Sequence, residues 1–152
     1  MVSVTLIRHA IADDGPDDAA RPLSKEGRRR FRKSVETLAR LGVRFEKVLH
    51  SPKRRALETA ELLRPVCAGA FEVTPLLTRE PTRDLLPLLD VHELAVVGHQ
   101  PHLSAPLAWL VIGDAKRGAC FELKKGAVAR LEGEVAPGGM VLRALWTPRV
   151  LR

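Results

Sequence analysis

The sequence predicts a single α/β domain over residues 1–152, a three-layer fold with a mainly parallel sheet, helices on both faces and a C-terminal antiparallel pair of strands. Short aliphatic runs at 2–7, 45–50 and 94–97 are each followed by polar residues and then a helical pattern, the order typical of parallel sheets. Aromatic residues make up only 4% of the chain, so the core must consist mainly of Leu, Val and Ala. A chain of 152 residues can bury about 70% of the surface it exposes when unfolded, so no second core is needed.

The first predicted strand, residues 2–7, ends directly in Arg8 and His9. A buried strand of β-branched and aliphatic residues does not ordinarily continue into an arginine and a histidine. Reactive groups in open α/β sheets gather outside the carboxyl ends of the strands. The pair therefore stands where a site is expected.

Residues 11–22 are predicted to form a loop, because they contain Gly, two prolines and two acidic pairs, Asp13-Asp14 and Asp17-Asp18. The acidic pairs lack the regular spacing of a calcium loop, so we interpret them as solvated. Ser24 then caps a helix that reaches about residue 41, where Gly42 ends it.

A second strand, 45–50, leads into Ser51 and Pro52, which resemble the N-cap and first residue of a helix that extends to about residue 63. Arg54 and Arg55 fall in its first turn, where the helix dipole disfavours cations. A helix N-terminus flanked by arginines is a strong anion site. The first turn is therefore a candidate for phosphate binding.

In the second half of the chain we predict a short strand at 71–73, a helix at 82–90 and a buried strand at 94–97 that leads to His99. A helix is predicted to begin at Pro101. The terminal strand pair is expected at 127–131 and 140–146.

Placed side by side on a parallel sheet, the three strand-to-helix junctions would surround one pocket with two arginines and two histidines. A neutral imidazole can attack phosphorus in line, and guanidinium groups can hold the oxygens that carry the transition-state charge. The predicted pocket is a phosphate site that contains a nucleophile. Neither Cys67 nor Cys120 has an arginine six residues later, so the cysteine phosphatase loop is absent.

Four segments in this order resemble the motifs of the histidine phosphatase (phosphoglycerate mutase-like) superfamily: Leu6-Ile-Arg-His-Ala10, Arg21-Pro-Leu-Ser-Lys-Glu-Gly27, Ser51-Pro-Lys-Arg-Arg-Ala-Leu-Glu-Thr59 and Val97-Gly-His-Gln-Pro101. The short length and the Arg-Pro-Leu-Ser block most resemble its SixA branch, the protein phosphohistidine phosphatases. Ala10 departs from the family pattern, because much of the superfamily has glycine there.

The resemblance implies that His9 is the nucleophile that becomes phosphorylated, that Arg8 and Arg55 bind the phosphoryl oxygens, and that His99 stabilises the transferred group. Arg55 is preferred to Arg54 because it holds the family's position before Ala56 and Thr59. Arg21 and Ser51 are expected at the border of the pocket.

The general acid is the main departure from the family. Many members have a glutamate after the third strand; Glu80 is the nearest candidate here, Asp84 is the second and Asp13 the third. Phosphohistidine that is protonated on its other ring nitrogen expels neutral imidazole, whose conjugate acid has a pKa of about 6.5, whereas a sugar or serine phosphate expels a strongly basic alkoxide. A weak or missing acid therefore favours phosphohistidine in a protein as the substrate. A small-molecule phosphomonoesterase or mutase is the alternative.

The net charge of +7 is unevenly distributed, because residues 21–64 contain 14 Lys or Arg against 5 Asp or Glu. Within this stretch Arg28 to Lys33 form either a solvated basic face or a docking surface for an acidic protein. A non-catalytic basic module that binds phosphate or nucleic acid is the remaining alternative. The chain has no Tyr, and only Phe31 and Phe45 lie in the basic stretch, which argues against stacking on nucleic acid.

No cofactor or metal is expected. His99 and His102 could supply two zinc ligands, but no Cys or acidic partner follows nearby, so we interpret His102 as a loop residue. The two cysteines lie far apart, as reduced thiols of a cytoplasmic protein would. The N-terminus lacks an uninterrupted apolar run, so we expect a chain that is mature from Met1 and has no membrane span.

Overall fold

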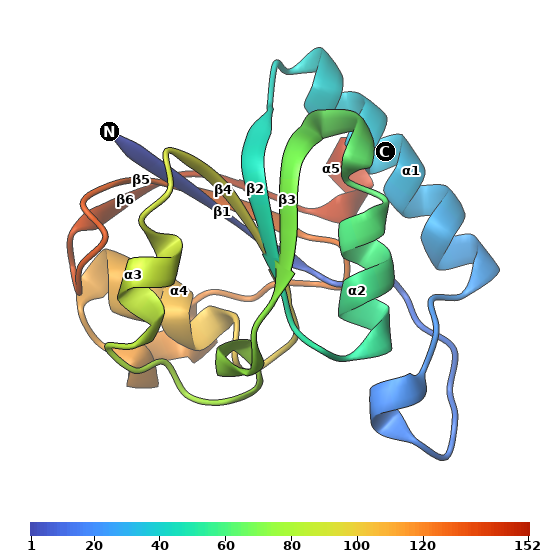
Figure 1. Cartoon of the computed structure of the whole chain (residues 1–152), viewed down its shortest axis with the longest axis horizontal. Coiled ribbons are helices and arrows are strands. Elements are labelled where there is room, and N and C mark those ends of the chain that lie inside the picture. Colours follow the sequence, from blue (N-terminus) through green and yellow to red (C-terminus); the bar gives the residue numbers. More distant parts are fainter.

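The computed structural model describes all residues from 1 to 152 and contains one six-stranded sheet in the order β3-β2-β4-β1-β5-β6 (Figure 1). Four strands are parallel, and β5 and β6 run antiparallel at one edge. The strands are β1 (Val2–Arg8), β2 (Phe45–His50), β3 (Cys67–Val73), β4 (Glu93–Gly98), β5 (Val128–Gly133) and β6 (Met140–Trp146). The predicted fold class is confirmed.

Helices cover both faces of this sheet (Figure 1). One face carries α1 (Lys25–Arg40), α2 (Arg54–Glu61) and α5 (Pro148–Leu151), and the other carries α3 (Leu85–Leu89) and α4 (Ser104–Ile112). The remaining helical turns are short 3-10 segments, at Asp18–Ala20, Arg64–Val66, Pro75–Thr78 and Ala115–Cys120. The two layers of helix give the chain two apolar cores, one on each side of the sheet.

Alternation along the strands supplies both cores. In β4, Leu94 and Val96 face the core under α3 and α4, whereas Ala95 and Val97 face the core under α1 and α2. All four side chains are fully buried, as expected for a central strand with helices on both faces. Leucine, valine and alanine dominate both cores, as the shortage of aromatic residues predicts.

The helix α1 packs tightly against the loop that follows β1, and Gly27 permits this approach. A Cβ atom at Gly27 would lie 2.1 Å from the main-chain oxygen of Ile11. The Ser24 hydroxyl caps the helix by accepting a hydrogen bond from the Gly27 N–H at 2.9 Å, and Ser24 Oγ also donates to Ile11 O. The predicted cap is therefore present, and it also fastens the loop after β1.

Several element boundaries differ from the predictions. Helix α2 begins at Arg54, with Lys53 as its N-cap, because the Ser51 hydroxyl accepts from the Lys53 N–H in a separate turn before the helix. Strand β3 begins at Cys67, four residues before the predicted 71–73 segment, and α4 begins at Ser104, three residues after Pro101. The turn at Ala115–Cys120 and the short α5 are not predicted by periodicity, since neither is long enough to show a helical repeat.

Candidate active site

Three strand ends meet at the carboxyl edge of the sheet. Arg8 lies opposite Gly98 in the β1–β4 pairing, and His50 lies opposite Val97 in the β2–β4 pairing. The residues that follow these strands are His9, His99 and Ser51, so the register alone brings them to one place. The His9 N–H donates to Gly98 O at 2.9 Å, and the Ser51 N–H donates to Val97 O at 3.1 Å.

His9 is only 4% exposed, and both its ring nitrogens have neighbours. Nδ1 lies 2.7 Å from the main-chain oxygen of Ala10, which can only accept, so Nδ1 carries the proton. Nε2 then holds the free lone pair, and it accepts a hydrogen bond from Arg55 Nε at 3.3 Å. Burial, followed by the positive charges of Arg55 and Arg8, lowers the pKa of His9 to about 4. The imidazole is therefore neutral near pH 7, with an unprotonated Nε2.

Arg55 is buried beside His9, while its neighbour Arg54 is not. The Arg55 side chain is 7% exposed and donates to the main-chain oxygen of Asp18 at 2.8 Å. The Arg54 side chain is 53% exposed and pairs with Glu58 at 3.3 Å on the outer face of α2. Thr59 accepts from the Ala10 N–H at 3.0 Å and donates to Arg55 O at 2.7 Å, which ties α2 to the residue after His9.

Asp18 is a site residue that the sequence interpretation assigned to a solvated loop. Its carboxylate contacts three cationic side chains, Lys53 at 2.9 Å, Arg21 at 3.2 Å and Arg55 at 3.3 Å. The hydrogen bond from Lys53, followed by those from the arginines, holds the pKa of Asp18 well below its usual range. A stable carboxylate thus forms ion pairs with the cations beside His9. We call Asp18, Lys53 and Arg55 the cationic cradle.

Arg21 lies on the outer side of the cradle. It donates from Nε to the main-chain oxygen of Asp13 at 2.9 Å and pairs with Asp18, so its contacts are with the loop and not with His9. Lys53 is the second site residue that received no separate role from the sequence. Its position within the Ser51–Arg55 segment is the signal that could have found it.

His99 and Ser51 form the other wall of the site. The Ser51 hydroxyl lies 3.1 Å from His99 Nε2, and both residues are buried. Burial, then the charges of Lys53 and Arg55, lower the pKa of His99 to about 4. His99 is therefore neutral before an anion has bound, because burial and the surrounding cations disfavour a further positive charge.

Arg8, the residue before His9, is half-buried, and one hydrogen bond holds its guanidinium. Its Nη1 donates to the main-chain oxygen of Leu123 at 2.7 Å, whereas its buried Nε has no partner. Burial, with a contribution from the nearby Arg55, lowers its pKa. The Arg8 guanidinium therefore retains donor capacity toward an anion.

The three carboxyl groups considered as general acids lie apart from His9. Glu80, Asp84 and Asp13 are all exposed, and none forms a side-chain hydrogen bond with a site residue. Glu80 lies on the wall of an open groove that also includes Gln100 and Pro101, the two residues after His99. It is the only one of the three candidate acids that lines this groove.

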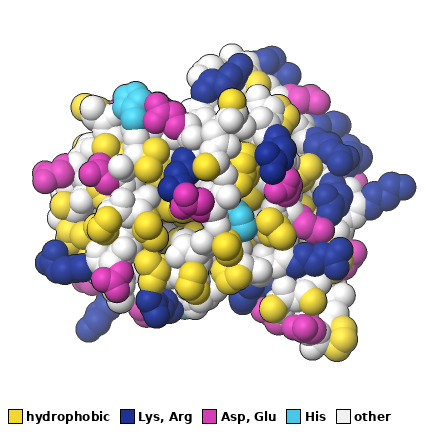
Figure 2. Space-filling view, in the orientation of Figure 1, with side chains coloured by type: hydrophobic (Ala, Val, Ile, Leu, Met, Phe, Trp, Pro, Cys, Tyr) yellow, Lys and Arg dark blue, Asp and Glu magenta, His cyan; other side chains and the backbone are white.

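The basic face on α1 is extensively paired with acidic side chains. Arg28 contacts Glu58 at 2.8 Å, and Arg30 contacts Glu26 at 2.7 Å. Figure 2 shows the many basic side chains on the side of the molecule formed by α1 and α2, with acidic side chains among them. Of residues 28–33, only Arg32 and Lys33 carry a charge without an ion pair.

The structure contains neither a cluster of metal ligands nor a helix of membrane-spanning length. No group of three or more His, Cys, Asp or Glu side chains is placed to hold a metal ion. The rings of His99 and His102 lie edge to face, with centroids 5.8 Å apart. No helix is long and apolar enough to cross a membrane.

The arrangement combines a neutral imidazole with fixed cations. Nε2 of His9 accepts from the Arg55 guanidinium, and Arg55 and Lys53 contact the same oxygen of Asp18, Oδ2. A tetrahedral anion that displaced this carboxylate would meet Arg55 and Lys53 directly. Donors fixed in advance around a developing charge are what phosphoryl transfer requires.

Comparison with known proteins identifies relatives along the whole chain. The sequence model of the histidine phosphatase superfamily (branch 1) matches residues 4–80. An uncharacterized protein of Picosynechococcus sp. is 33% identical over 145 residues, which cover 85% of this chain and 84% of the relative.

Solved structures match the fold closely. The protein histidine phosphatase SixA complexed with tungstate has a TM-score of 0.83 at 25% identity, covering 99% of this chain and 100% of the other. A putative phosphohistidine phosphatase SixA from Agrobacterium tumefaciens has a TM-score of 0.79 at 20% identity, with 97% and 98% covered. A phosphoserine phosphatase from Entamoeba histolytica, in complex with 3-phosphoglyceric acid, has a TM-score of 0.77 at 14% identity over the full length of both chains. The last two show that the fold is shared.

Proposed function

Because the chain belongs to the histidine phosphatase superfamily and is a phosphatase, we propose that it acts through a phosphohistidine intermediate on His9 and that its substrate is phosphohistidine in a protein. The observation that carries the proposal is the contact between His9 Nε2 and Arg55 Nε at 3.3 Å. This contact lies beside two cations, Lys53 and Arg55, that already bind one negative charge, the carboxylate of Asp18. This contact puts the lone pair of a neutral imidazole next to a binding place for negative charge.

The proposed reaction has two displacements on phosphorus. His9 Nε2 attacks the phosphoryl group in line, a nitrogen–phosphorus bond forms, and the bond to the leaving group breaks. Water then attacks phosphorylated His9, the nitrogen–phosphorus bond breaks, and inorganic phosphate leaves. Arg8, Lys53 and Arg55 hold the phosphoryl oxygens in both steps, since their charges match those of the equatorial oxygens.

His99 is proposed to take up a proton as the phosphoryl group binds. Its pKa is about 4 in the free site because Lys53 and Arg55 are positive and burial removes water. A bound dianion offsets those charges and favours the imidazolium. Ser51, through its hydrogen bond to Nε2, orients the ring. Protonation of His99 is thus coupled to substrate binding.

The choice of phosphohistidine rests on the leaving group. Asp18 is held ionised and cannot donate a proton, while Glu80 is exposed and contacts no site residue. An alkoxide leaving group needs such a donor. Phosphohistidine that is protonated on its other ring nitrogen does not, because it expels neutral imidazole, whose conjugate acid has a pKa of about 6.5. The cradle also opens to solvent, since the Asp18 side chain is 58% exposed, which suits a phosphorylated side chain on another protein.

The test compares hydrolysis of a phosphohistidine protein, an aryl phosphate and an alkyl phosphate under identical conditions, with and without chelator, and with His9→Ala as the blank. We expect the rates to fall in that order, the chelator to have no effect, and labelled phosphate to be trapped as an acid-labile phosphoramidate. Undiminished activity in His9→Ala, or label on a serine or aspartate, would refute the intermediate. Dependence on added magnesium would refute the metal-free mechanism.

A second candidate function is hydrolysis of small phosphate esters. The observation that favours it is the position of Glu80 in a groove that is also lined by Gln100 and Pro101, the two residues that follow His99 in the chain. Glu80→Gln separates the two functions, with Glu122→Gln in the same groove as the matched control. A small effect on phosphohistidine supports the first function, whereas loss of a high rate on alkyl phosphates, seen with Glu80→Gln alone, would establish the second.

A further inference from the structure

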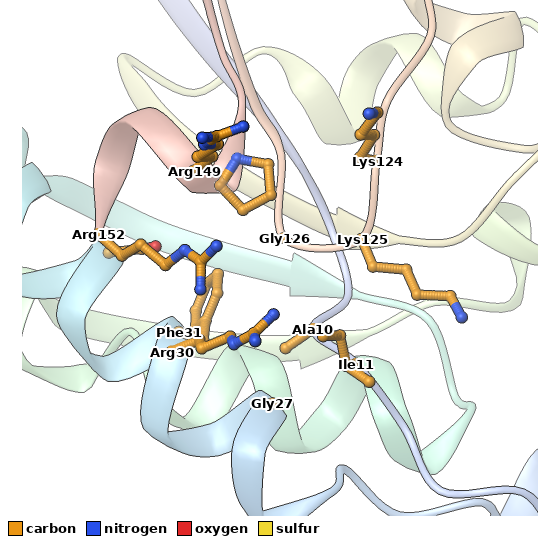
Figure 3. Close-up of a pocket in the computed structure, with 12 residues that line it drawn as sticks. Ala10, Ile11, Gly27, Arg30, Phe31, Lys124, Lys125, Gly126, Arg149 and Arg152 are labelled. Atoms are coloured by element: carbon orange, nitrogen blue, oxygen red, sulfur yellow. The ribbon is translucent and has the colours of Figure 1, made fainter.

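A second basic hollow lies behind the site, between α1, α5 and the turn that precedes β5 (Figure 3). Its volume is about 200 Å³. In Figure 3, Arg30 reaches toward it from α1 and Arg152 from the end of the chain, while Lys125 leaves the turn on the opposite side. Ala10 and Ile11, the two residues that follow His9, form part of its wall.

The lining of this hollow is strongly positive. Five of its side chains are cationic and none is acidic; the cations are Arg30, Lys124, Lys125, Arg149 and Arg152. Only Arg30 has an ion-pair partner, Glu26, and the other four form no salt bridge. Cations gathered from three separate elements repel one another unless an anion lies among them. The lining therefore has the composition of an anion site.

A buried polar group on the wall points to the same conclusion. Ser34 is only 1% exposed, lines the hollow from α1, and its hydroxyl forms no hydrogen bond within the chain. Buried polar groups are almost always paired, so this hydroxyl is available to a ligand. Phe31 and Pro148 add an apolar part to the lining.

The size of the hollow limits the ligand. Liquid water occupies about 30 Å³ per molecule, so about 200 Å³ holds a compact anion and is small beside the 300–1,000 Å³ of typical sites for drug-sized ligands. Four unpaired cations match the charge of two phosphoryl groups better than that of one.

The hollow is joined to the active site by main-chain hydrogen bonds. The Gly126 N–H, on its lining, donates to Arg8 O and His9 O at 3.0 Å each. Leu123 O, in the same turn, accepts from Arg8 Nη1 at 2.7 Å. An anion bound in the hollow would therefore contact, at Gly126, the turn that positions Arg8 and His9.

We propose that this hollow is a second anion site, distinct from the cationic cradle, that binds a compact polyanion with two phosphoryl groups. It goes beyond the proposed function, since hydrolysis at His9 does not use these residues. Its ligand lies against Ser34, between Arg30 and Arg152, and contacts the turn that holds Arg8 and His9.

Inorganic pyrophosphate is the probe, measured by titration calorimetry. We expect two bound equivalents in the native protein, one in Arg55→Ala, where the cradle is disabled, and one in the double variant Arg149→Gln/Arg152→Gln. The matched control is Arg40→Gln/Arg143→Gln, which removes the same charge from exposed positions elsewhere and should bind two. Loss of all binding in Arg55→Ala would overturn the second site. Equal weakening by the control would show that net charge alone attracts the probe.

Two further measurements fix the place and the ligand class. In the Arg55→Ala protein, pyrophosphate should shift the Gly126 amide resonance, and it should bind at least tenfold more tightly than inorganic phosphate. Equal affinities would overturn the assignment to two phosphoryl groups, and an unmoved Gly126 resonance would overturn the location. Aryl phosphate hydrolysis without pyrophosphate should be unchanged in Arg149→Gln/Arg152→Gln, which would show that the fold and the catalytic site are intact.

Discussion

The cationic cradle and the basic face of α1 contain the same kind of side chain but differ in what their charges contact. In the cradle, Arg55 is buried and directed by the main chain and carboxylate of Asp18 toward His9. On α1, Arg28 and Arg30 form ion pairs with Glu58 and Glu26, respectively. A run of arginines in a sequence therefore indicates a site only where one guanidinium is buried and is held beside a candidate reactive group, as Asp18 holds Arg55 beside His9.

The largest expected effect distinguishes two adjacent arginines of α2. Arg55→Ala should lower kcat/KM by about 10²–10³, the usual consequence of removing one donor to a developing charge. Arg54→Ala, the matched control, removes an exposed ion pair with Glu58 worth about 1 kcal/mol or less and should leave kcat/KM nearly unchanged. Steady-state kinetics on an aryl phosphate, with thermal unfolding to check the fold, measures both. A larger loss in Arg54→Ala would contradict the assignment of Arg55.

That pair of residues also shows how far the sequence could be interpreted. Alternating strands and helices predicted the fold, and the strand ends predicted that His9, His99 and Ser51 would meet, because register in a parallel sheet follows from the hydrophobic pattern. Helical periodicity did not separate Arg54 from Arg55; the family motif did. The structure adds the physical reason, since only Arg55 lies on the face of α2 toward His9.

Asp18 and Lys53 could not be predicted in the same way. Asp18 lies in the loop between β1 and α1. It is 35 positions away from Lys53 in the sequence, and its approach to Lys53 depends on loop geometry that no periodic pattern encodes. The same holds for the hollow beside Ser34, whose cations come from α1, the turn before β5 and the end of the chain. Sites that are assembled from loops and chain ends can be identified only from the three-dimensional structure.

The second prediction uses pH, because the cradle's cations help to keep both site histidines neutral. His9 and His99 have pKa values of about 4 in the folded chain and about 6.5 when unfolded. The unfolded state therefore binds more protons between these values, and the free energy of unfolding should decrease as pH falls from about 6.5 to about 4. A fully shifted histidine contributes on the order of 3 kcal/mol to this loss.

Denaturant unfolding in phosphate-free buffer at several pH values measures this dependence, and histidine NMR of the folded protein identifies the groups. His99→Asn should flatten the pH dependence, since it removes one of the two titrating rings. Addition of vanadate, a phosphoryl mimic, should raise the pKa of His99. A site histidine that titrates near pH 6.5 in the free protein would contradict the effect of the cradle.

The third prediction concerns the carboxylate inside the cradle. Asp18 competes with a phosphoryl group for Lys53 and Arg55, so Asp18→Asn should strengthen inhibition by inorganic phosphate about fivefold, which corresponds to about 1 kcal/mol for one charge near the surface. Asp17→Asn is the matched control, because Asp17 caps the adjacent 3-10 turn and contacts no cradle cation. Inhibition constants for phosphate give the comparison. Weaker inhibition in Asp18→Asn would mean that the carboxylate serves chiefly to hold Arg55 in place.

The smallest expected effect belongs to the α1 face, where only Arg32 and Lys33 lack an acidic partner. If a phosphorylated protein docks there, Arg32→Gln/Lys33→Gln should lower kcat/KM for that protein about twofold to threefold at low salt, through slower association, and the loss should vanish as salt is added. An aryl phosphate should be unaffected, because it is too small to contact α1 while bound beside His9. The control Arg29→Gln, whose charge is already paired with Glu26, should change neither substrate. Equal losses for the protein and the aryl phosphate would show that the α1 charges act on the cradle itself, and the distinction between the two basic regions would then fail.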